Sequence, residues 1–252
     1  MSNYEIFSGY HQQGNPLLLG NAWNVHSARI FEKNGYKAIG TSSLAIAHSL
    51  GYEDGEKISF AELFFIVERI MAQVSVPVSV DIEAGYSHNI ADVIRNIEKL
   101  HDAGVVGINL EDSLQGQLIP ADEFSKKLDN IKNHLVKNNI QIFINARTDA
   151  FLFRIPSALD ITLDRIKAYE NAGADGIFVP FIVDKNEIKS ITAATSLPIN
   201  VLSVPQLPSF DDLSALGVRR ISLGSSAFRA TYTNFENLVK NIAIARSVEP
   251  LF

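Results

Sequence analysis

The stretch SVDIEAGYSHN, residues 79–89, places two acidic residues directly after an apolar run that is typical of a buried strand. The run from Pro77 to Val80 leads into Asp81 and Glu83, which are one residue apart, and Gly85 follows. A buried strand rarely ends in two carboxylates without a reason. The explanation has to come from the elements on either side of this strand.

Short apolar runs rich in β-branched residues alternate with longer amphipathic stretches along the whole chain. The apolar runs predict eight strands, at residues 17–21, 37–41, 76–81, 105–110, 140–146, 176–180, 197–202 and 219–223. The amphipathic stretches predict eight helices, at residues 24–34, 59–73, 89–103, 121–137, 158–172, 185–194, 209–216 and 225–245. Ser59 followed by Glu62 predicts a capping box at the start of the second of these helices.

Eight strands that alternate with eight helices in 252 residues predict a single-domain (β/α)8 TIM barrel spanning residues 1–252. The strands read as continuous apolar runs, as expected for strands that are buried on both faces. The alternative is an open doubly wound sheet. That fold would place a glycine-rich phosphate-binding turn after the first strand, and LGNAWN at residues 19–24 is not such a turn.

The composition excludes several kinds of partner and covalent chemistry. The net charge of −6 argues against nucleic-acid partners, because binding a phosphate backbone requires clustered positive charge. The chain has no cysteine, which excludes disulfides, thiolate metal sites and a cysteine nucleophile, and is consistent with a cytoplasmic setting. No apolar run reaches the ~18 residues needed to span a bilayer, and the first residues do not form a secretory signal.

In a (β/α)8 barrel the catalytic groups lie at the C-terminal ends of the strands. Candidate groups follow the second, third, fourth, fifth and seventh strands: Asp54 and Glu56, Asp81 and Glu83, Glu111 and Asp112, Arg147 and Asp149, and Asn200. Several carboxylates at one rim need a cation, and oxygen ligands without Cys or His favour Mg²⁺. Taken singly, each acid could instead be a helix cap or a surface residue, and Arg147 could form a structural ion pair with Asp149.

Three motifs at these strand ends resemble the isocitrate lyase/phosphoenolpyruvate mutase superfamily. They are VDIEAGYS at residues 80–87, GINLEDS at residues 107–113 and NARTDAF at residues 145–151, and the resemblance extends over nearly the whole chain. It implies a Mg²⁺-dependent barrel, with Mn²⁺ as an alternative ion. It also implies that the enzyme forms or breaks a C–C or P–C bond next to a 2-oxo acid, through a metal-stabilised, pyruvate-like enolate.

The resemblance also assigns roles to individual residues. Asp81 corresponds to the direct metal ligand, and the outer acids that reach the metal through water correspond to Glu83, Asp54 and Glu111. The loop that binds the carboxylate of the 2-oxo acid corresponds to Ser42, Ser43 and Leu44. Arg147 corresponds to the substrate-binding arginine, and Asn200 is a weaker match for a polar substrate contact. The catalytic candidates are therefore Asp54, Glu111 and Arg147. Trp23, after the first strand, either forms a wall of the ligand pocket or packs under a helix.

The chain departs from the pattern of the family at several positions. Glu83 stands where an Asp is frequent, Asn24 where an Asp is frequent, and Ser43 where a glycine is common. After the fourth strand, the family's lyases carry a long gating loop with a Lys-x-Cys-Gly-His motif. Here EDSLQGQLIPADEF, residues 111–124, reaches the next helix in about ten residues and contains no Cys, Lys or His.

The loss of this loop argues against an isocitrate-type or methylisocitrate-type lyase, whose acid or base is the loop cysteine. We expect a Mg²⁺-dependent lyase that breaks a C–C bond next to a 2-oxo acid, acting on a small 2-oxo or 2-hydroxy carboxylate. The alternatives are a P–C bond enzyme and a 2-oxo-acid-binding barrel with little activity. Family members often exchange their last helices between subunits. Because the chain ends soon after the eighth helix, we expect little to remain for such an exchange, and a homo-oligomer stays open.

Overall fold

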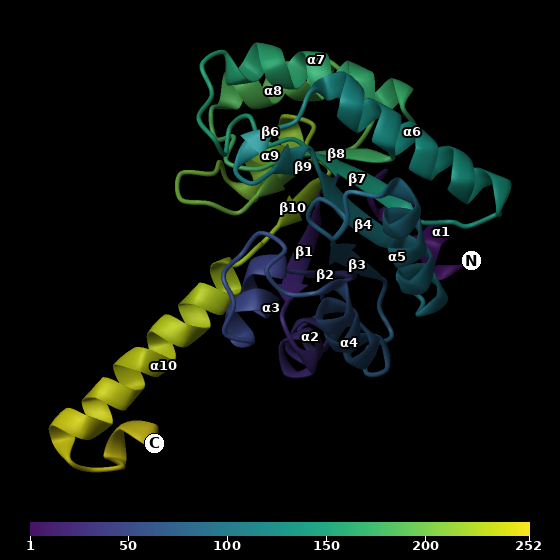
Figure 1. The fold of residues 1–252 in the computed structure, drawn as a ribbon. Helices are drawn as coiled ribbons and strands as arrows, with labels where there is room; N and C mark the ends of the chain where they lie inside the picture. Colours follow the sequence, from purple (N-terminus) through teal and green to yellow (C-terminus); the bar gives the residue numbers. More distant parts are fainter.

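The computed structural model describes all of residues 1–252 and contains a closed barrel of eight parallel strands (Figure 1). Neighbouring strands around the barrel follow the order β1-β10-β9-β8-β7-β4-β3-β2. The barrel strands are β1 (Leu17–Ala22), β2 (Ile39–Thr41), β3 (Val78–Asp81), β4 (Gly107–Glu111), β7 (Phe143–Arg147), β8 (Gly176–Val179), β9 (Ile199–Leu202) and β10 (Arg220–Ser222). All eight expected strands are present, so the predicted TIM-barrel fold is confirmed.

The eight expected helices are also present, and all of them except α10 surround the barrel. They are α2 (Val25–Lys33), α4 (Phe60–Met71), α5 (Ile90–Asp102), α6 (Ala121–Lys137), α7 (Ala158–Asn171), α8 (Lys185–Ala193), α9 (Phe210–Ala215) and α10 (Ser226–Ala245). The predicted capping box is confirmed at α4. The Ser59 hydroxyl accepts from the Glu62 N–H at 3.2 Å, and the Glu62 carboxylate accepts from the Ser59 N–H at 2.8 Å. No helix of the chain combines the length and apolar character that crossing a bilayer requires.

Four short elements were not predicted from the sequence. They are α1 (Asn3–Tyr10), α3 (Ser43–Ser49), the hairpin of β5 (Ser113–Leu114) and β6 (Gln117–Leu118), and the 3-10 helix η1 (Glu249–Leu251). Helix α1 closes the N-terminal end of the barrel, where Phe7 is fully buried against Phe143. Helix α3 and the hairpin lie at the opposite, C-terminal end.

Helix α10 starts on the barrel and then extends away from it (Figure 1). Phe228 in its first turns is buried against Trp23. Further along, large apolar side chains are exposed, including Phe235 (59%) and Ile244 (82%). The sequence analysis expected little to remain for an exchange between subunits, and that expectation did not take into account the projecting part of α10. The last helix itself is long and projects its apolar side chains into solvent.

Candidate active site

Two adjoining cavities open at the C-terminal ends of the strands. One has a volume of about 290 Å³ and is lined by Asp81, Asn109 and the start of α3. The other has a volume of about 580 Å³ and is lined by Glu83 and Glu111. Both include Ser43, Asp54, Arg147 and Leu152 in their walls. The two cavities are therefore parts of one site, called here the rim site.

Asp81, the last residue of β3, is held at the centre of the rim site. Its backbone N–H donates to the Thr41 hydroxyl at 3.0 Å, and its Oδ2 accepts from the Ser43 hydroxyl at 3.1 Å. Its Oδ1 is buried and has no hydrogen-bond partner within the protein. Burial raises the pKa of Asp81, and the nearby Arg147 opposes that increase. An uncompensated buried carboxylate oxygen is an arrangement that a cation would stabilise.

Glu83 connects two loops of the rim. Its Oε2 accepts from the Glu56 N–H at 2.7 Å, and its Oε1 accepts from the Tyr86 hydroxyl at 3.0 Å. Glu56 in turn accepts from the Tyr86 N–H at 2.7 Å. These bonds fasten the loop that carries Asp54 to the end of β3. The longer side chain at position 83 therefore has a structural use in this chain, beside the outer-acid role that the resemblance implies.

Arg147, the last residue of β7, contacts two acids of the rim site, of which Asp149 is fully buried and Glu111 is partly exposed. Its Nε donates to Asp149 Oδ1 at 2.7 Å, and its Nη1 lies 3.0 Å from Glu111 Oε2. The structural ion pair with Asp149, left open by the sequence, is thus present. Nη2 makes no hydrogen bond within the protein, and Arg147 lines both cavities, so this nitrogen is free for a ligand. Ser113 Oγ is within hydrogen-bond distance of both Glu111 (3.0 Å) and Asp149 (2.7 Å).

The start of α3 forms one wall of the smaller cavity. Ser42 is its N-cap and its side chain accepts from the Ala45 N–H. The first N–H groups of a helix have no partner inside the helix, which leaves the N–H groups of Ser43 and Leu44 available. Ser42, Ser43 and Leu44 all line the cavity. The position expected for a substrate carboxylate is therefore a short helix start with free donors.

Three other candidates lie away from the rim cavities. Asp112 is fully buried, and its Oδ2 accepts from Arg165 at 2.8 Å and Tyr169 at 2.6 Å, so it holds α7 against β4. Trp23 packs edge-on against Phe228 of α10, with ring centroids 5.3 Å apart. Of the two alternatives for Trp23, the structure therefore shows packing under a helix. Asn200 is buried in the barrel and bonds Ser222, which does line the smaller cavity.

Residues missed by the sequence analysis also reach the rim. Lys127 on α6 donates to the Ala84 carbonyl and lines a neighbouring cavity together with Glu56 and Glu111. Burial lowers the pKa of Lys127, while Glu56 and Glu111 raise it. The only sequence signal for this placement is that Lys127 lies in the second turn of a helix that follows a rim strand.

The side chains of the rim site fit a Mg²⁺ ion. Nowhere in the chain do three His, Cys, Asp or Glu side chains come close enough to hold a metal by themselves. Mg²⁺, however, is commonly held by one or two carboxylates together with waters and substrate oxygens. Asp81 offers one buried oxygen without a donor. In addition to burial, the charge of Asp54 raises the pKa of Asp81, and the charges of Asp81 and Asp54 raise the pKa of Glu83, so the three acids lie close to one another.

The stability of the metal-free protein is expected to fall as pH rises. Burial, with Asp81 and Asp54, raises the pKa of Glu83 from 4.5 to about 8. Between these values the folded chain holds more protons than the unfolded chain, so increasing pH favours unfolding. In EDTA, urea midpoints at pH 5.5 and 8 should differ more for wild type than for Glu83→Gln. Equal differences for the two proteins would contradict the role assigned to Glu83.

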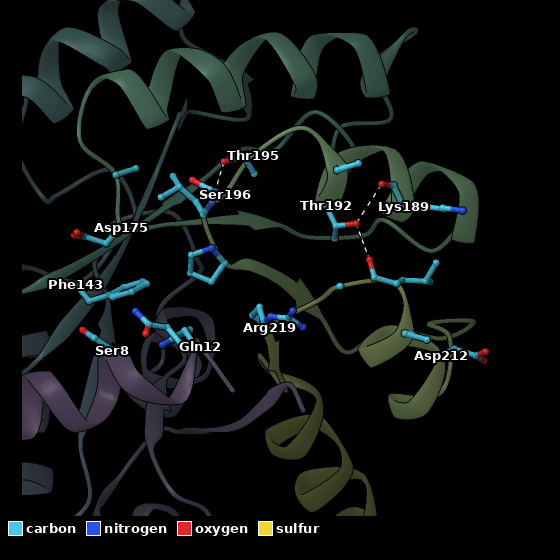
Figure 2. A pocket seen from close by; sticks show the side chains of 18 of the residues that line it. Ser8, Gln12, Phe143, Asp175, Lys189, Thr192, Thr195, Ser196, Asp212 and Arg219 are labelled. Atoms are coloured by element: carbon cyan, nitrogen blue, oxygen red, sulfur yellow. Dashed lines mark hydrogen bonds between the residues drawn. The ribbon is translucent and has the colours of Figure 1, made fainter. Parts of the chain in front are cut away.

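The largest cavity of the molecule, of about 900 Å³, lies at the opposite end of the barrel (Figure 2). Its walls come from α1, the N-terminal ends of strands and the ends of α8 and α9. Its two acids are already paired, Asp175 with Lys132 at 2.6 Å and Asp212 with Lys185 at 2.9 Å. Two buried atoms in its walls, Ser8 Oγ and His11 Nε2, also have no hydrogen-bond partner. Burial lowers the pKa of His11 to about 3, so neither group carries a charge at neutral pH, and the rim site with its carboxylates is the better candidate for chemistry.

The chain is similar to several known proteins. A family model described as phosphoenolpyruvate phosphomutase matches residues 7–243. An uncharacterized protein of Mycobacterium tuberculosis is 37% identical over 89% of this chain and 83% of its own length. Oxaloacetate decarboxylase of a Bradyrhizobium strain is 31% identical over 80% of this chain and 70% of its own length.

A solved structure has the same fold. Phosphonopyruvate hydrolase in complex with oxalate and Mg²⁺ superposes with a TM-score of 0.86 at 22% identity. The match covers 98% of this chain and 89% of the hydrolase chain. At this level of identity the likeness concerns the fold alone.

Proposed function

Because the chain belongs to the phosphoenolpyruvate phosphomutase family, within the isocitrate lyase/phosphoenolpyruvate mutase superfamily of lyases and mutases, we propose that it is a Mg²⁺-dependent carbon–carbon lyase. The proposed substrate is a short 2-oxo dicarboxylate that is cleaved or decarboxylated next to the oxo group. One observation carries the proposal. Asp81, the free donors at the start of α3 and the free Nη2 of Arg147 line a single cavity of about 290 Å³.

Substrate binding follows from the donors around that cavity. The N–H groups of Ser43 and Leu44 suit the substrate carboxylate, since backbone donors at a helix start favour anions. Arg147 Nη2 suits the 2-oxo oxygen, because Nε and Nη1 are committed to Asp149 and Glu111. In this pose, the bond that breaks points toward the larger of the two rim cavities, which Glu83 and Glu111 line.

During cleavage, negative charge develops on the oxo oxygen as the enolate forms. A Mg²⁺ ion at Asp81 would supply the electrophile that stabilises this charge. Arg147 Nη2 donates to the same oxygen and gains strength as the charge develops. Glu111 is suited to return a proton to the enolate carbon, because burial, opposed by Arg147, raises its pKa to about 8.

The short hairpin after β4 explains how the site could work without a long lid. The turn at Gln115 and Gly116 has positive φ at both residues (51° and 77°), as a tight two-residue hairpin turn requires. It leaves the larger cavity open to water, which favours small substrates and modest rates over a sealed reaction. The similarity to an oxaloacetate decarboxylase supports the same class of reaction.

The test is a panel of 2-oxo and 2-hydroxy dicarboxylates, with oxaloacetate included, assayed for Mg²⁺-dependent release of a pyruvate-like product. Turnover of one member above the rate in EDTA is the expected result. The second candidate is a P–C bond enzyme, and the description of the matching family model as phosphoenolpyruvate phosphomutase supports it. Phosphorus NMR on phosphonopyruvate would detect cleavage or transfer of the phosphoryl group. Binding of these compounds without any product would instead favour a binding protein.

We also propose that the chain forms a homo-oligomer through α10. The exposed apolar side chains of α10, which include Tyr232, Phe235 and Val239, are costly to leave in water. Light scattering after gel filtration should give a mass of at least two chains. Replacing Phe235 and Val239 by Lys should shift that mass toward one chain. A wild-type protein that elutes with the mass of one chain at micromolar concentration contradicts this proposal.

A further inference from the structure

A fully buried arginine lies under the floor of the rim site. Arg220 on β10 is 1% exposed and forms no ion pair. Its Nε contacts Ser222 Oγ at 3.3 Å, its Nη2 contacts Asn109 Oδ1 at 3.3 Å, and the Phe7 ring lies below it with its centroid 5.9 Å away. A buried guanidinium without a carboxylate is expensive, so its retention calls for a use.

The contact between Arg220 and Asn109 suggests that Arg220 orients the Asn109 side chain. This residue is 4% exposed and lines the smaller cavity. It pairs with Asp81 of β3 on one side and with Asn145 of β7 on the other, so it lies beside the carboxylate proposed to hold the metal. Its Oδ1 accepts from Asn145 Nδ2 at 2.9 Å as well as from Arg220.

These two contacts fix which way the Asn109 amide faces. A guanidinium has only donors, so the atom of Asn109 that meets Arg220 must be the oxygen. Asn109 Nδ2 is then turned elsewhere, and it donates to no group of the protein. Asn109 Nδ2 is not one of the fully buried atoms that have no partner, so it is accessible from the cavity. The free N–H groups of Asn109 are therefore the polar atoms that this residue presents to the cavity.

We propose that Asn109 is a ligand-binding residue of the rim site that donates an N–H to an anionic oxygen of the bound 2-oxo acid, and that Arg220 is the positioning residue that turns it there. The inference rests on the proposed function, because it assumes that the rim site binds such an acid. Arg220 adds a positive charge on the barrel axis beneath the ligand. Together the two residues favour dianionic over monoanionic ligands.

Calorimetric titration of oxalate in the presence of Mg²⁺ tests the assignment on the full chain. Asn109→Asp replaces the donor by an acceptor of the same shape, and the new carboxylate can pair with Arg220, so the fold should be kept. We expect its Kd for oxalate to rise at least about tenfold, as expected for losing a hydrogen bond to a charged group. Asn109→Ser, which lacks the amide, should weaken binding similarly.

Arg220→Met should raise the Kd on the order of fivefold, and Arg220→Lys, which keeps a donor and the charge, should restore most of the affinity. Rescue by Lys distinguishes positioning from a merely structural role, which thermal unfolding midpoints monitor separately. Ser79→Ala is the matched control. Its buried hydroxyl also faces the barrel interior but has no partner, so the affinity should not change.

The outcomes separate this inference from the proposed function. If wild type binds oxalate with Mg²⁺ but folded Asn109→Asp or Asn109→Ser binds equally well, the role of Asn109 is refuted while the proposed function stands. If Arg220→Met binds as tightly as wild type, the positioning role of Arg220 is refuted. If wild type itself does not bind oxalate, the proposed function fails first and this inference fails with it.

Discussion

Replacing Asp81 by Asn is expected to abolish turnover while leaving the fold intact. The change removes the charge of the one carboxylate that offers a buried, unpartnered oxygen to a cation. We expect the rate to fall on the order of 10³-fold, at the upper end for loss of one preorganised electrostatic group. Because burial already disfavours the charged form of Asp81, the metal-free variant should be at least as stable as wild type.

Steady-state kinetics measures the loss of turnover, and urea unfolding measures the stability of the metal-free variant. Asp81→Ala should lose activity equally. Asp122→Asn is the control, because Asp122 is exposed at the start of α6, where it only pairs with Lys126. It should keep wild-type turnover. An Asp81→Asn enzyme that retains more than a tenth of the wild-type rate would remove Asp81 from the site.

Arg147→Met is expected to lose both stability and activity. The change leaves Glu111 and Asp149 without their cation in a site where Asp149 has only 1% of its side chain exposed. Removing one partner of a buried ion pair costs about 3–5 kcal/mol of unfolding free energy. Turnover should fall on the order of 10²- to 10³-fold, because the free Nη2 that we assign to the developing oxyanion is also lost.

A double variant separates the two effects. Arg147→Met with Asp149→Asn removes the stranded charge of Asp149, so it should recover part of the lost stability without recovering turnover. The unfolding free energies of both single variants and the double variant give the coupling between the two side chains. If Arg147→Met unfolds at the same urea concentration as wild type, the ion-pair network does not contribute as described here.

The sequence predicted the barrel because its strands are buried on both faces and are separated by amphipathic helices of regular length. Three of the missed elements carry local signals in the sequence. Ser2 and Glu5 form a capping box at the start of α1, and Ser42 caps α3. The hairpin turn at Gln115 and Gly116 was also readable as a tight turn. Each of these signals is weak, because the segments are short and have no room for a periodic apolar pattern.

The candidate site was predictable only in part. Acids at the ends of strands point to one rim, which brings together Asp81, Glu83 and Glu111. The contacts of Glu83 with Glu56 and Tyr86 depend on how the loop after β2 packs against the loop after β3. No pattern in the sequence predicts this packing. Arg220 and Asn109 are 111 residues apart and meet only because the barrel closes. The burial of Asp112 by α7 likewise depends on tertiary packing.

The central claim is that the rim site binds a metal together with the enolate of a 2-oxo acid, and oxalate is a stable mimic of that enolate. The most direct measurement is calorimetric titration of oxalate into the full chain, with Mg²⁺ and then with EDTA. We expect binding with Mg²⁺ and none with EDTA, and loss of binding in Asp81→Asn. Absence of binding in both conditions, or equal binding in both, would contradict the claim.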